Sequence, residues 1–307
     1  MLEILIPTYN RSELLSRTLE NLKWSLTDGN VSVIVADNST NGETALMIGA
    51  LRKTFTFPFH YHKFKTHESD VGKSILRCIS LSSSKFVWVL GDDDLVSPGA
   101  VAYLLSVLRK NQNVGLVFIN YLTGKFNNNK IEKISGVFDL EEPYKSSNIS
   151  ALNFLPEISF ISSCIFNREE FLIKNKRDYQ NCYGYEFLAP MLLCSSDLEF
   201  IYIQYPLVLQ RRLFKRSWDD LYPLYYFVGL PNTWRVVSKS LNSKEVIPSF
   251  LSYRSIKPLC ILASSAKSRK ICMSHIKNEL SLLKYSILYV IVTLVPSFVA
   301  KFILRRA

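Results

Sequence analysis

The sequence lacks the cysteine pattern of a zinc protein and the leader of a secreted one. None of its six cysteines forms a C-x-x-C pair, and no histidine stands at a zinc-ligand spacing from them. The opening Met-Leu-Glu-Ile-Leu-Ile-Pro has no basic segment, and its apolar run is too short for a signal peptide. An even cysteine count would allow disulfides, but reduced and mostly buried thiols in a cytoplasmic protein are the better expectation.

The sequence also lacks a glycine-rich phosphate loop. Gly72-Lys73-Ser74 matches the end of such a loop, but His67 stands where the motif requires its first glycine. The chain contains no internal repeat and no low-complexity segment. These absences exclude P-loop and repeat proteins. They leave a globular fold, whose core the 48% of apolar residues can fill.

Acidic residues are scarce relative to basic ones. There are 37 Lys and Arg against 26 Asp and Glu, which gives a net charge of +11 and an isoelectric point near 9.3. Near the C-terminus a single acid, Glu279, accompanies a series of basic residues: Lys267, Arg269, Lys270, Lys277, Lys284, Lys301, Arg305 and Arg306. Because this series flanks an apolar run, we expect an anionic membrane surface, and not nucleic acid, as the partner.

The apolar run at residues 285–300 carries no charge and lies between Lys284 and Lys301. It is shorter than the ~20 residues that a spanning helix needs, and Pro296 interrupts it. The flanking basic side chains can reach lipid phosphates from such a position. We therefore expect an interfacial or re-entrant anchor at residues 280–307; the alternative is a helix buried against the rest of the protein.

Strand-like and helix-like segments alternate through the first two thirds of the chain. Apolar runs predict strands at residues 2–6, 31–36, 86–90 and 114–121, and residues 59–64 and 159–166 are also expected to be strands. Caps and helical spacing predict helices from residue 12 onward and at residues 42–54, 70–83, 98–110, 168–176 and 184–194. This order is typical of an α/β protein with a mostly parallel sheet flanked by helices.

The alternation fades beyond residue 210. Helices are predicted at residues 213–241, with breaks at Pro223 and Pro231, and at residues 250–266 and 270–304. We therefore expect one domain at residues 1–210 and a helical C-terminal region at residues 211–307.

Three consecutive carboxylates, Asp92, Asp93 and Asp94, follow the predicted strand at residues 86–90. Unpaired, these charges are too costly to bury. Mn²⁺ and Mg²⁺ prefer oxygen ligands and commonly bridge to a diphosphate, so the sequence predicts a metal site that stabilises a leaving nucleoside diphosphate. The alternative is a solvated acidic turn that caps the helix after Pro98.

Asp37 ends the predicted strand at residues 31–36. In parallel sheets, ligands bind at the carboxyl ends of the strands. A carboxylate there can accept the N3–H of uracil or thymine. The alternative is that residues 37–40 form only a turn and a helix cap.

These two features, together with Ile-Leu-Ile-Pro-Thr-Tyr-Asn-Arg at residues 4–11, resemble the family 2 glycosyltransferases of the GT-A fold. The resemblance covers residues 1–120 well and residues 155–195 loosely. Gly91 stands where many members carry an aspartate, and the resulting Gly-Asp-Asp-Asp form is similar to the abequosyltransferase-like proteins of O-antigen synthesis.

The resemblance implies a role for each matching residue. The nucleotide pocket would be lined by Pro7, Thr8 and Tyr9, and Asp37 would contact the base. Asp93 matches the metal-binding aspartate of the family. Asp94 would be the second metal ligand, and Asp92 would support the donor.

Lys73 and Arg77 are four residues apart in the predicted helix at residues 70–83 and so share one face. The family often has an arginine in this helix, which implies that these residues steady the diphosphate. The alternative is a solvated basic face.

An inverting transfer needs a general base that deprotonates the acceptor hydroxyl. The family usually supplies an Asp or Glu at the start of a helix, and the matching segment here contains Glu186. Asp178 and Glu170 are the rival candidates.

The resemblance implies an inverting glycosyltransferase of bacterial O-antigen or capsule synthesis. It would use Mn²⁺ or Mg²⁺ and transfer a sugar from a UDP-, dTDP- or CDP-sugar to a lipid-linked saccharide. Its expected location is peripheral, on the inner face of the cell membrane. The alternatives are a sugar-nucleotide nucleotidyltransferase, which usually has a glycine-rich loop, and a non-catalytic membrane-bound partner with the same fold.

Overall fold

The computed structural model describes residues 1–26, 30–127, 130–136, 151–154, 157–177, 179, 181–212, 220–241 and 256–306. The chain divides into two compact units. The first, which we call the sheet unit, consists of Met1–Ser69, Lys73–Arg177 and Pro190–Leu213. The second, the helical unit, consists of Asp70–Gly72, Asp178–Ala189 and Phe214–Ala307.

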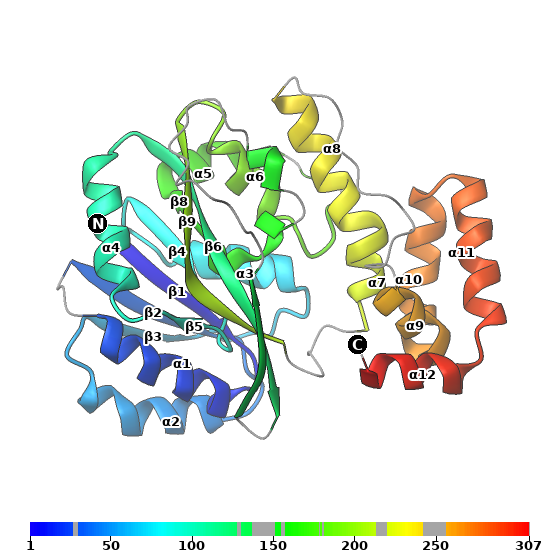
Figure 1. Ribbon diagram of the computed structural model, residues 1–307, viewed down its shortest axis with the longest axis horizontal. Helices are drawn as coiled ribbons and strands as arrows, with labels where there is room; N and C mark the ends of the chain where they lie inside the picture. Colours follow the sequence, from blue (N-terminus) through cyan, green and yellow to red (C-terminus); the bar gives the residue numbers. More distant parts are fainter. Residues whose placement is uncertain are drawn as a thin grey trace. The chain divides into compact units, whose positions relative to one another are not determined.

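Four parallel strands form the first half of the sheet, as the alternating pattern predicts (Figure 1). They are β1 Leu2–Thr8, β2 Val31–Asp37, β3 Phe59–Lys63 and β4 Phe86–Val89. β1 lies between β2 and β4, and β3 pairs with the other side of β2. The carboxyl ends of these strands, where the predicted site residues follow, therefore share one edge of the sheet.

The second half of the sheet mixes the two strand directions. β8 Cys164–Asn167 runs antiparallel between β4 and β6 Val114–Asn127, and β6 pairs in parallel with β9 Glu199–Arg212. β9 also pairs with the two-residue β5 Leu95–Val96, and β7 Lys130–Gly136 pairs with β6, both antiparallel. The order is β3-β2-β1-β4-β8-β6-β9-β5. Neither β5 nor β9 was predicted from the sequence.

The prediction of a strand at residues 159–166 is wrong over its first half. Glu157–Ser159 and Ile161–Ser163 form 3₁₀ turns, and only Cys164–Asn167 is a strand. The Ser163 hydroxyl donates to the Phe160 carbonyl, and this local hydrogen bond favours a turn over a strand.

Helices α1 to α6 lie at the predicted positions with shifted ends (Figure 1). They are α1 Ser12–Ser25, α2 Glu43–Leu51, α3 Val71–Ile79, α4 Ala100–Lys110, α5 Arg168–Lys174 and α6 Leu188–Leu193. α1 fully buries Leu15, Leu19 and Leu22, each worth about 1.5–3 kcal/mol. α6 begins later than predicted because Gly184, with φ 75°, has a left-handed conformation that a right-handed helix excludes.

The helical unit contains the elements after residue 220. They are α7 Tyr222–Leu224, the π-helix η5 Tyr225–Gly229, α8 Leu230–Ser240, α9 Ile256–Ser264, α10 Ala266–Glu279, α11 Leu282–Leu294 and α12 Ser297–Arg306. The breaks predicted at Pro223 and Pro231 are wrong. Residues 222–240 are helical without interruption: Pro223 lies in the first turn, where a missing N–H leaves no hydrogen bond unmade, and Pro231 directly follows the π-helix η5 within the run.

Within the helical prediction for residues 270–304, the interruption at Pro296 is confirmed, whereas a second break between α10 and α11 was not predicted. Ser281 caps α11 by accepting a hydrogen bond from the Lys284 amide, and Pro296 separates α11 from α12. The core of this unit includes Phe227, Leu262 and Leu288. All six cysteines of the chain are free and buried, as predicted.

No single helix in the described ranges is long and apolar enough to cross a bilayer. α11 and Ser297–Leu304 meet the requirement of length and composition only as a pair, which is bent by 94°.

Candidate active site

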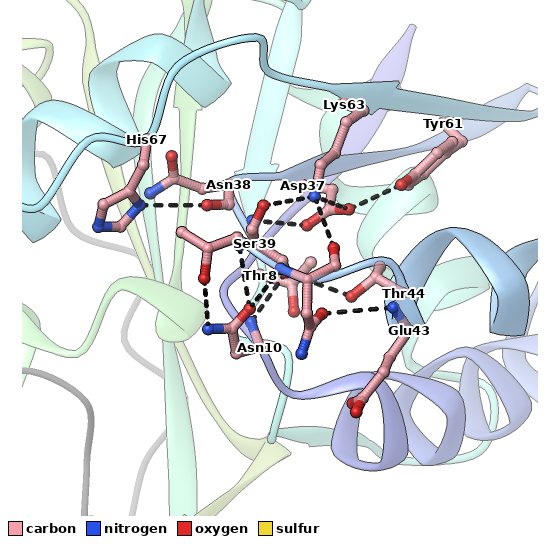
Figure 2. A network of polar contacts seen from close by, with 12 residues as sticks. Thr8, Asn10, Asp37, Asn38, Ser39, Glu43, Thr44, Tyr61, Lys63 and His67 are labelled. Carbon is pink, nitrogen blue, oxygen red and sulfur yellow. Dashed lines mark hydrogen bonds and ion pairs between the residues drawn. The ribbon is translucent and has the colours of Figure 1, made fainter.

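Asp37, at the end of β2, is fully buried within a network of hydrogen bonds (Figure 2). Its Oδ1 accepts from the Ser39 amide at 2.8 Å, and its Oδ2 accepts from the Tyr61 hydroxyl at 2.7 Å and from Lys63 Nζ at 3.1 Å. Burial alone would raise the pKa of Asp37, but these hydrogen bonds outweigh burial and hold the pKa below its usual value. Asp37 is thus an ionised internal group that ties β3 to the end of β2.

Two asparagines connect the loops at this edge of the sheet (Figure 2). Asn10 has φ 51°, a left-handed conformation that asparagine tolerates. Its side-chain Oδ1 accepts a hydrogen bond from the Thr40 backbone N–H at 3.0 Å, and its backbone N–H donates to Ser39 Oγ at 2.8 Å. The Asn38 side chain forms two hydrogen bonds with the Glu68 backbone, at 2.7 and 2.9 Å. The loops after β1, β2 and β3 are therefore fixed to one another.

The Tyr9 side chain lies at the same edge, with the His67 ring stacked on it. The two ring centroids are 4.5 Å apart and the ring planes differ by 22°. His67 Nδ1 also lies 3.2 Å from the Asn38 carbonyl oxygen. The sequence predicts Tyr9 but not His67, because no local pattern links two residues so far apart in the chain. Pro7, also predicted here, pairs with Ala36 within the sheet.

The three aspartates after β4, which we call the Asp triplet, are held by neighbouring elements. Thr8 Oγ1 donates to Asp92 Oδ2 at 2.7 Å, so two predicted site residues are in contact. Ser162 Oγ donates to Asp94 Oδ2 at 2.6 Å, and the Arg211 amide donates to Asp94 Oδ1 at 3.3 Å. Asp92 and Asp94 are consequently buried and fixed in orientation.

Asp93 has a more exposed carboxylate than Asp92, 18% against 6%. A methyl group at the preceding Gly91 would lie 2.6 Å from Asp94 Oδ2 and 3.1 Å from Asp93 Oδ1, so both carboxylates converge on the space that this glycine leaves. Their oxygens suit Mn²⁺ or Mg²⁺. In the described part of the chain no three His, Cys, Asp or Glu side chains are grouped to hold an ion. The donor set fits a metal that takes its other ligands from a diphosphate.

Two carboxyl groups of the Asp triplet, those of Asp92 and Asp94, have pKa values above their usual range. Burial raises the pKa of Asp92 to about 6, and the charge of Asp93 adds to this effect, while Arg11 opposes it. Burial also raises the pKa of Asp94 well above its usual value, again reinforced by Asp93. A cation beside these carboxylates is therefore strongly favoured.

Arg11 supplies one such cation. Its Nη1 lies 3.1 Å from Asp92 Oδ1 and 3.4 Å from Asp93 Oδ2. Arg11 was not among the site residues predicted from the sequence, although it closes the Pro-Thr-Tyr-Asn-Arg segment on which the resemblance rests. Its position in that segment was the available signal.

Lys73 and Arg77 both lie on α3, as the spacing predicts. The Arg77 guanidinium lies 4.0 Å from the centroid of the Phe64 ring and donates to the Thr66 carbonyl at 3.1 Å. Arg77 thus holds the segment that carries His67. A contact of Lys73 or Arg77 with a diphosphate stays a prediction.

Glu186 lies in the helical unit, in the turn before α6, whereas the Asp triplet belongs to the sheet unit. Its Oε2 is buried. The rival Glu170 forms an ion pair with Lys174 at 3.0 Å within α5, which indicates a structural role. The other rival, Asp178, lies outside the described residues. The role of Glu186 as general base stays a prediction, with Asp178 still a rival.

Comparison with known sequences identifies the family to which the sequence of this chain is similar. The sequence profile described as Glycosyl transferase family 2 matches residues 3–174. The chain is 26% identical over 120 residues to the abequosyltransferase RfbV of Salmonella typhimurium, covering 38% of this chain and 35% of that protein. It is 26% identical over 186 residues to the GalNAc(5)-diNAcBac-PP-undecaprenol beta-1,3-glucosyltransferase of Campylobacter jejuni, covering 60% and 57%. The matches thus span between a third and three fifths of these relatives' lengths.

Solved structures share the fold of the whole chain. S. aureus TarS 1-349 in complex with UDP has a TM-score of 0.53 and 11% identity, covering 99% of this chain and 90% of that one. The mannosyltransferase PcManGT from Pyrobaculum calidifontis, in complex with GDP-Man and Mn²⁺, has a TM-score of 0.51 and 12% identity, covering 99% and 85%. At such identities the likeness establishes the architecture alone.

Proposed function

This chain belongs to glycosyltransferase family 2 and has the GT-A fold, and we propose that it is an inverting enzyme that transfers one sugar from a nucleotide-diphosphate donor to a lipid-linked saccharide. The observation that carries this proposal is the joining of Thr8, from β1, to Asp92 of the Asp triplet. It unites the predicted nucleotide pocket with the predicted metal site at the carboxyl ends of adjacent parallel strands.

The donor nucleotide is proposed to bind across the ends of β1, β2 and β4. TarS is known in complexes with UDP and with UDP-GlcNAc, and a UDP-, dTDP- or CDP-sugar is our proposal for this chain. Asp37 is engaged on both oxygens, so at the base site it would act together with Lys63, whose ammonium it holds. Lys63 is 37% exposed, and its ammonium also donates to the carbonyl oxygens of Ser39 and Asn41, so a ligand at this site would replace one of these acceptors.

Mn²⁺ or Mg²⁺ is the proposed cofactor, held by Asp93 and Asp94. When bound, the ion would stabilise the negative charge on the leaving nucleoside diphosphate. Thr8 and Ser162 orient the flanking carboxylates of Asp92 and Asp94, so Asp93 keeps the more accessible oxygens for a ligand. Lys73 and Arg77 are proposed to add positive charge for the diphosphate.

The acceptor is proposed to be a lipid-linked saccharide of O-antigen or capsule synthesis, reached from the inner face of the cell membrane. One relative's name includes an undecaprenol-linked glycan. In this chain Leu282, Leu283, Leu294 and Phe298 of α11 and α12 are each more than 70% exposed. Exposed apolar side chains next to Lys284 and Lys301 suit contact with an anionic bilayer surface. Glu186 is the proposed general base that deprotonates the acceptor hydroxyl.

Calorimetric binding of UDP, dTDP and CDP, each with and without Mn²⁺, tests the proposal on the wild type and on Asp93→Ala. We expect one nucleotide to bind tightly, and only with both the metal and Asp93. Folded protein that binds none of the three would instead indicate a non-catalytic partner. Binding that Asp93→Ala leaves unchanged would make the Asp triplet a structural turn.

A further inference from the structure

The loop that carries Glu186 is held in a defined conformation. Asn181 and Gly184 have left-handed φ angles of 62° and 75°. The Tyr185 amide donates to the Cys182 carbonyl at 2.9 Å, and the Leu188 amide donates to the Tyr185 carbonyl at the same distance. Successive turns therefore set the direction in which the Glu186 side chain leaves the backbone.

Gly72 receives the Glu186 carboxylate. This glycine is buried at the second position of α3, and it belongs to the same unit as Glu186. A methyl group built on it would overlap Glu186 Oε2 and would lie 2.8 Å from the carbonyl carbon of Gly184. Only a residue without a side chain lets the carboxylate rest against the backbone here.

The location favours a negatively charged carboxylate. The first turn of a helix has backbone N–H groups without intrahelical partners and a partial positive charge. α3 has no acidic residue in its own first turn. Asp70 directly precedes α3, and the Glu186 carboxylate, whose Oε2 is buried beside Gly72, is a second anion at this helix end, brought from another part of the chain. A general base must be ionised before it can accept a proton.

Two further close contacts hold the same loop against the helices of its unit. A methyl group at Gly184 would lie 2.7 Å from the Tyr225 ring, and one at Gly229 would overlap the Tyr183 carbonyl oxygen. Tyr225 and Gly229 are the two ends of the π-helix η5, and π-helical turns occur frequently at functional sites. Burial, followed by the nearby charges of Asp70 and Glu186, raises the pKa of Tyr225.

We propose that Gly72 is a positioning residue for the sugar transfer: it seats the Glu186 carboxylate on the first turn of α3. The inference rests on the proposed role of Glu186 as general base. Gly72 belongs to the Gly72-Lys73-Ser74 segment, which resembles the end of a phosphate-binding loop. Its proposed role is in activating the acceptor and not in binding phosphate.

The test compares Gly72→Ala with Gly49→Ala, an exposed glycine of α2 that has nothing within 4 Å of its added methyl group. The nearest atom in the way is the end of the flexible Glu186 side chain, and the next is the backbone of Gly184, so we expect Gly72→Ala to fold and to move Glu186 together with its loop. The expected result is a loss in kcat of about 10- to 100-fold with an unchanged Kd for the nucleotide. Equal kcat for the two variants, or a parallel loss of nucleotide binding, overturns the proposal.

Glu186 variants separate this proposal from the function on which it rests. Glu186→Asp withdraws the carboxylate by one methylene, so Gly72→Ala should cost little further activity in that background. A full additional loss would mean that Gly72 acts independently of Glu186. Full turnover by Glu186→Gln would remove the base assignment itself, whereas an inactive Glu186→Gln beside a fully active Gly72→Ala would remove only the positioning role.

Discussion

Asp37 illustrates how a single buried carboxylate holds the end of a strand. Its pKa is lowered in the folded protein, so its contribution to stability is present above the unfolded pKa near 4 and is lost as the pH falls through the folded value. We expect Asp37→Asn to lower the free energy of unfolding by about 1–3 kcal/mol at pH 7, because Tyr61 and Lys63 lose a charged acceptor.

Denaturant unfolding at several pH values measures this effect. The difference between wild type and Asp37→Asn should shrink as the pH falls below 4. Glu13→Gln is the control, since Glu13 is 80% exposed and pairs only across the surface with Arg17. A difference that is constant across the pH range would contradict the expectation.

Arg11 places a positive charge beside Asp93, the proposed metal ligand. Its guanidinium contacts Asp92 and Asp93, and a divalent cation at Asp93 meets this positive charge nearby. We expect Arg11→Gln to bind Mn²⁺ alone about 3- to 10-fold more tightly than the wild type, because one repulsive charge is removed. Calorimetry in the absence of nucleotide measures this, with Arg17→Gln as the control. Unchanged or weaker binding would show that Arg11 does not oppose the ion.

Residues that follow a recognisable strand could be assigned to the site from the sequence. Side-chain contacts between distant loops, such as the one between Tyr9 and His67, could not. The positions of Asp37 and the Asp triplet follow from strand ends that apolar runs make visible. The stacking of His67 on Tyr9, by contrast, depends on the Asn38 bonds to the Glu68 backbone, which fix a segment far away in sequence.

At the scale of elements, buried parallel strands were the most predictable. β1, β2 and β4 are mostly apolar and mostly buried, as expected of strands covered on both faces, whereas the edge strand β3 has the sequence Phe-His-Tyr-His-Lys and is only partly buried. β9 escaped prediction because Gln204 and Pro206 interrupt its apolar residues, and β5 because two residues show no periodicity. In the helical unit, Pro223 lies at a helix start and Pro231 follows a π-helix within a continuous helical run, and the sequence pattern alone does not distinguish these positions from a break.

The α11–α12 pair makes a prediction about attachment to lipid. Leu283 and Phe298 are 71% and 74% exposed, so charging them should leave the fold intact. We expect the double variant Leu283→Glu/Phe298→Glu to bind vesicles of anionic phospholipid at least ~10-fold more weakly, since two apolar side chains no longer enter the interface. Co-sedimentation measures the binding.

Trp24→Glu provides the matched control for this experiment. Trp24 is 79% exposed but lies on α1 of the sheet unit. If the double variant and the wild type sediment equally with vesicles, the attachment site lies elsewhere. If Trp24→Glu weakens binding as much as the double variant, exposed apolar area in general, and not this helix pair, is responsible.

At the scale of the whole molecule, the net charge of +11 predicts a dependence on salt. Raising the salt concentration from roughly 50 mM to 500 mM should weaken binding to anionic vesicles several-fold, because screening shortens the reach of the surface charges. Binding to uncharged phosphatidylcholine vesicles should be weaker and nearly independent of salt. Equal affinity for both kinds of vesicle would exclude an electrostatic contribution.

The late position of β9 has a consequence for how the protein is made. The Asp triplet leaves the ribosome well before Arg211, whose amide binds Asp94, and before the strand that pairs with β5. At about 5–20 residues per second, the roughly 120 residues between them take about 6–24 s to synthesise. For that interval the nascent chain has the family's motifs but not the strand that completes their surroundings, so a fragment that ends at residue 174 is expected to remain in this unfinished state.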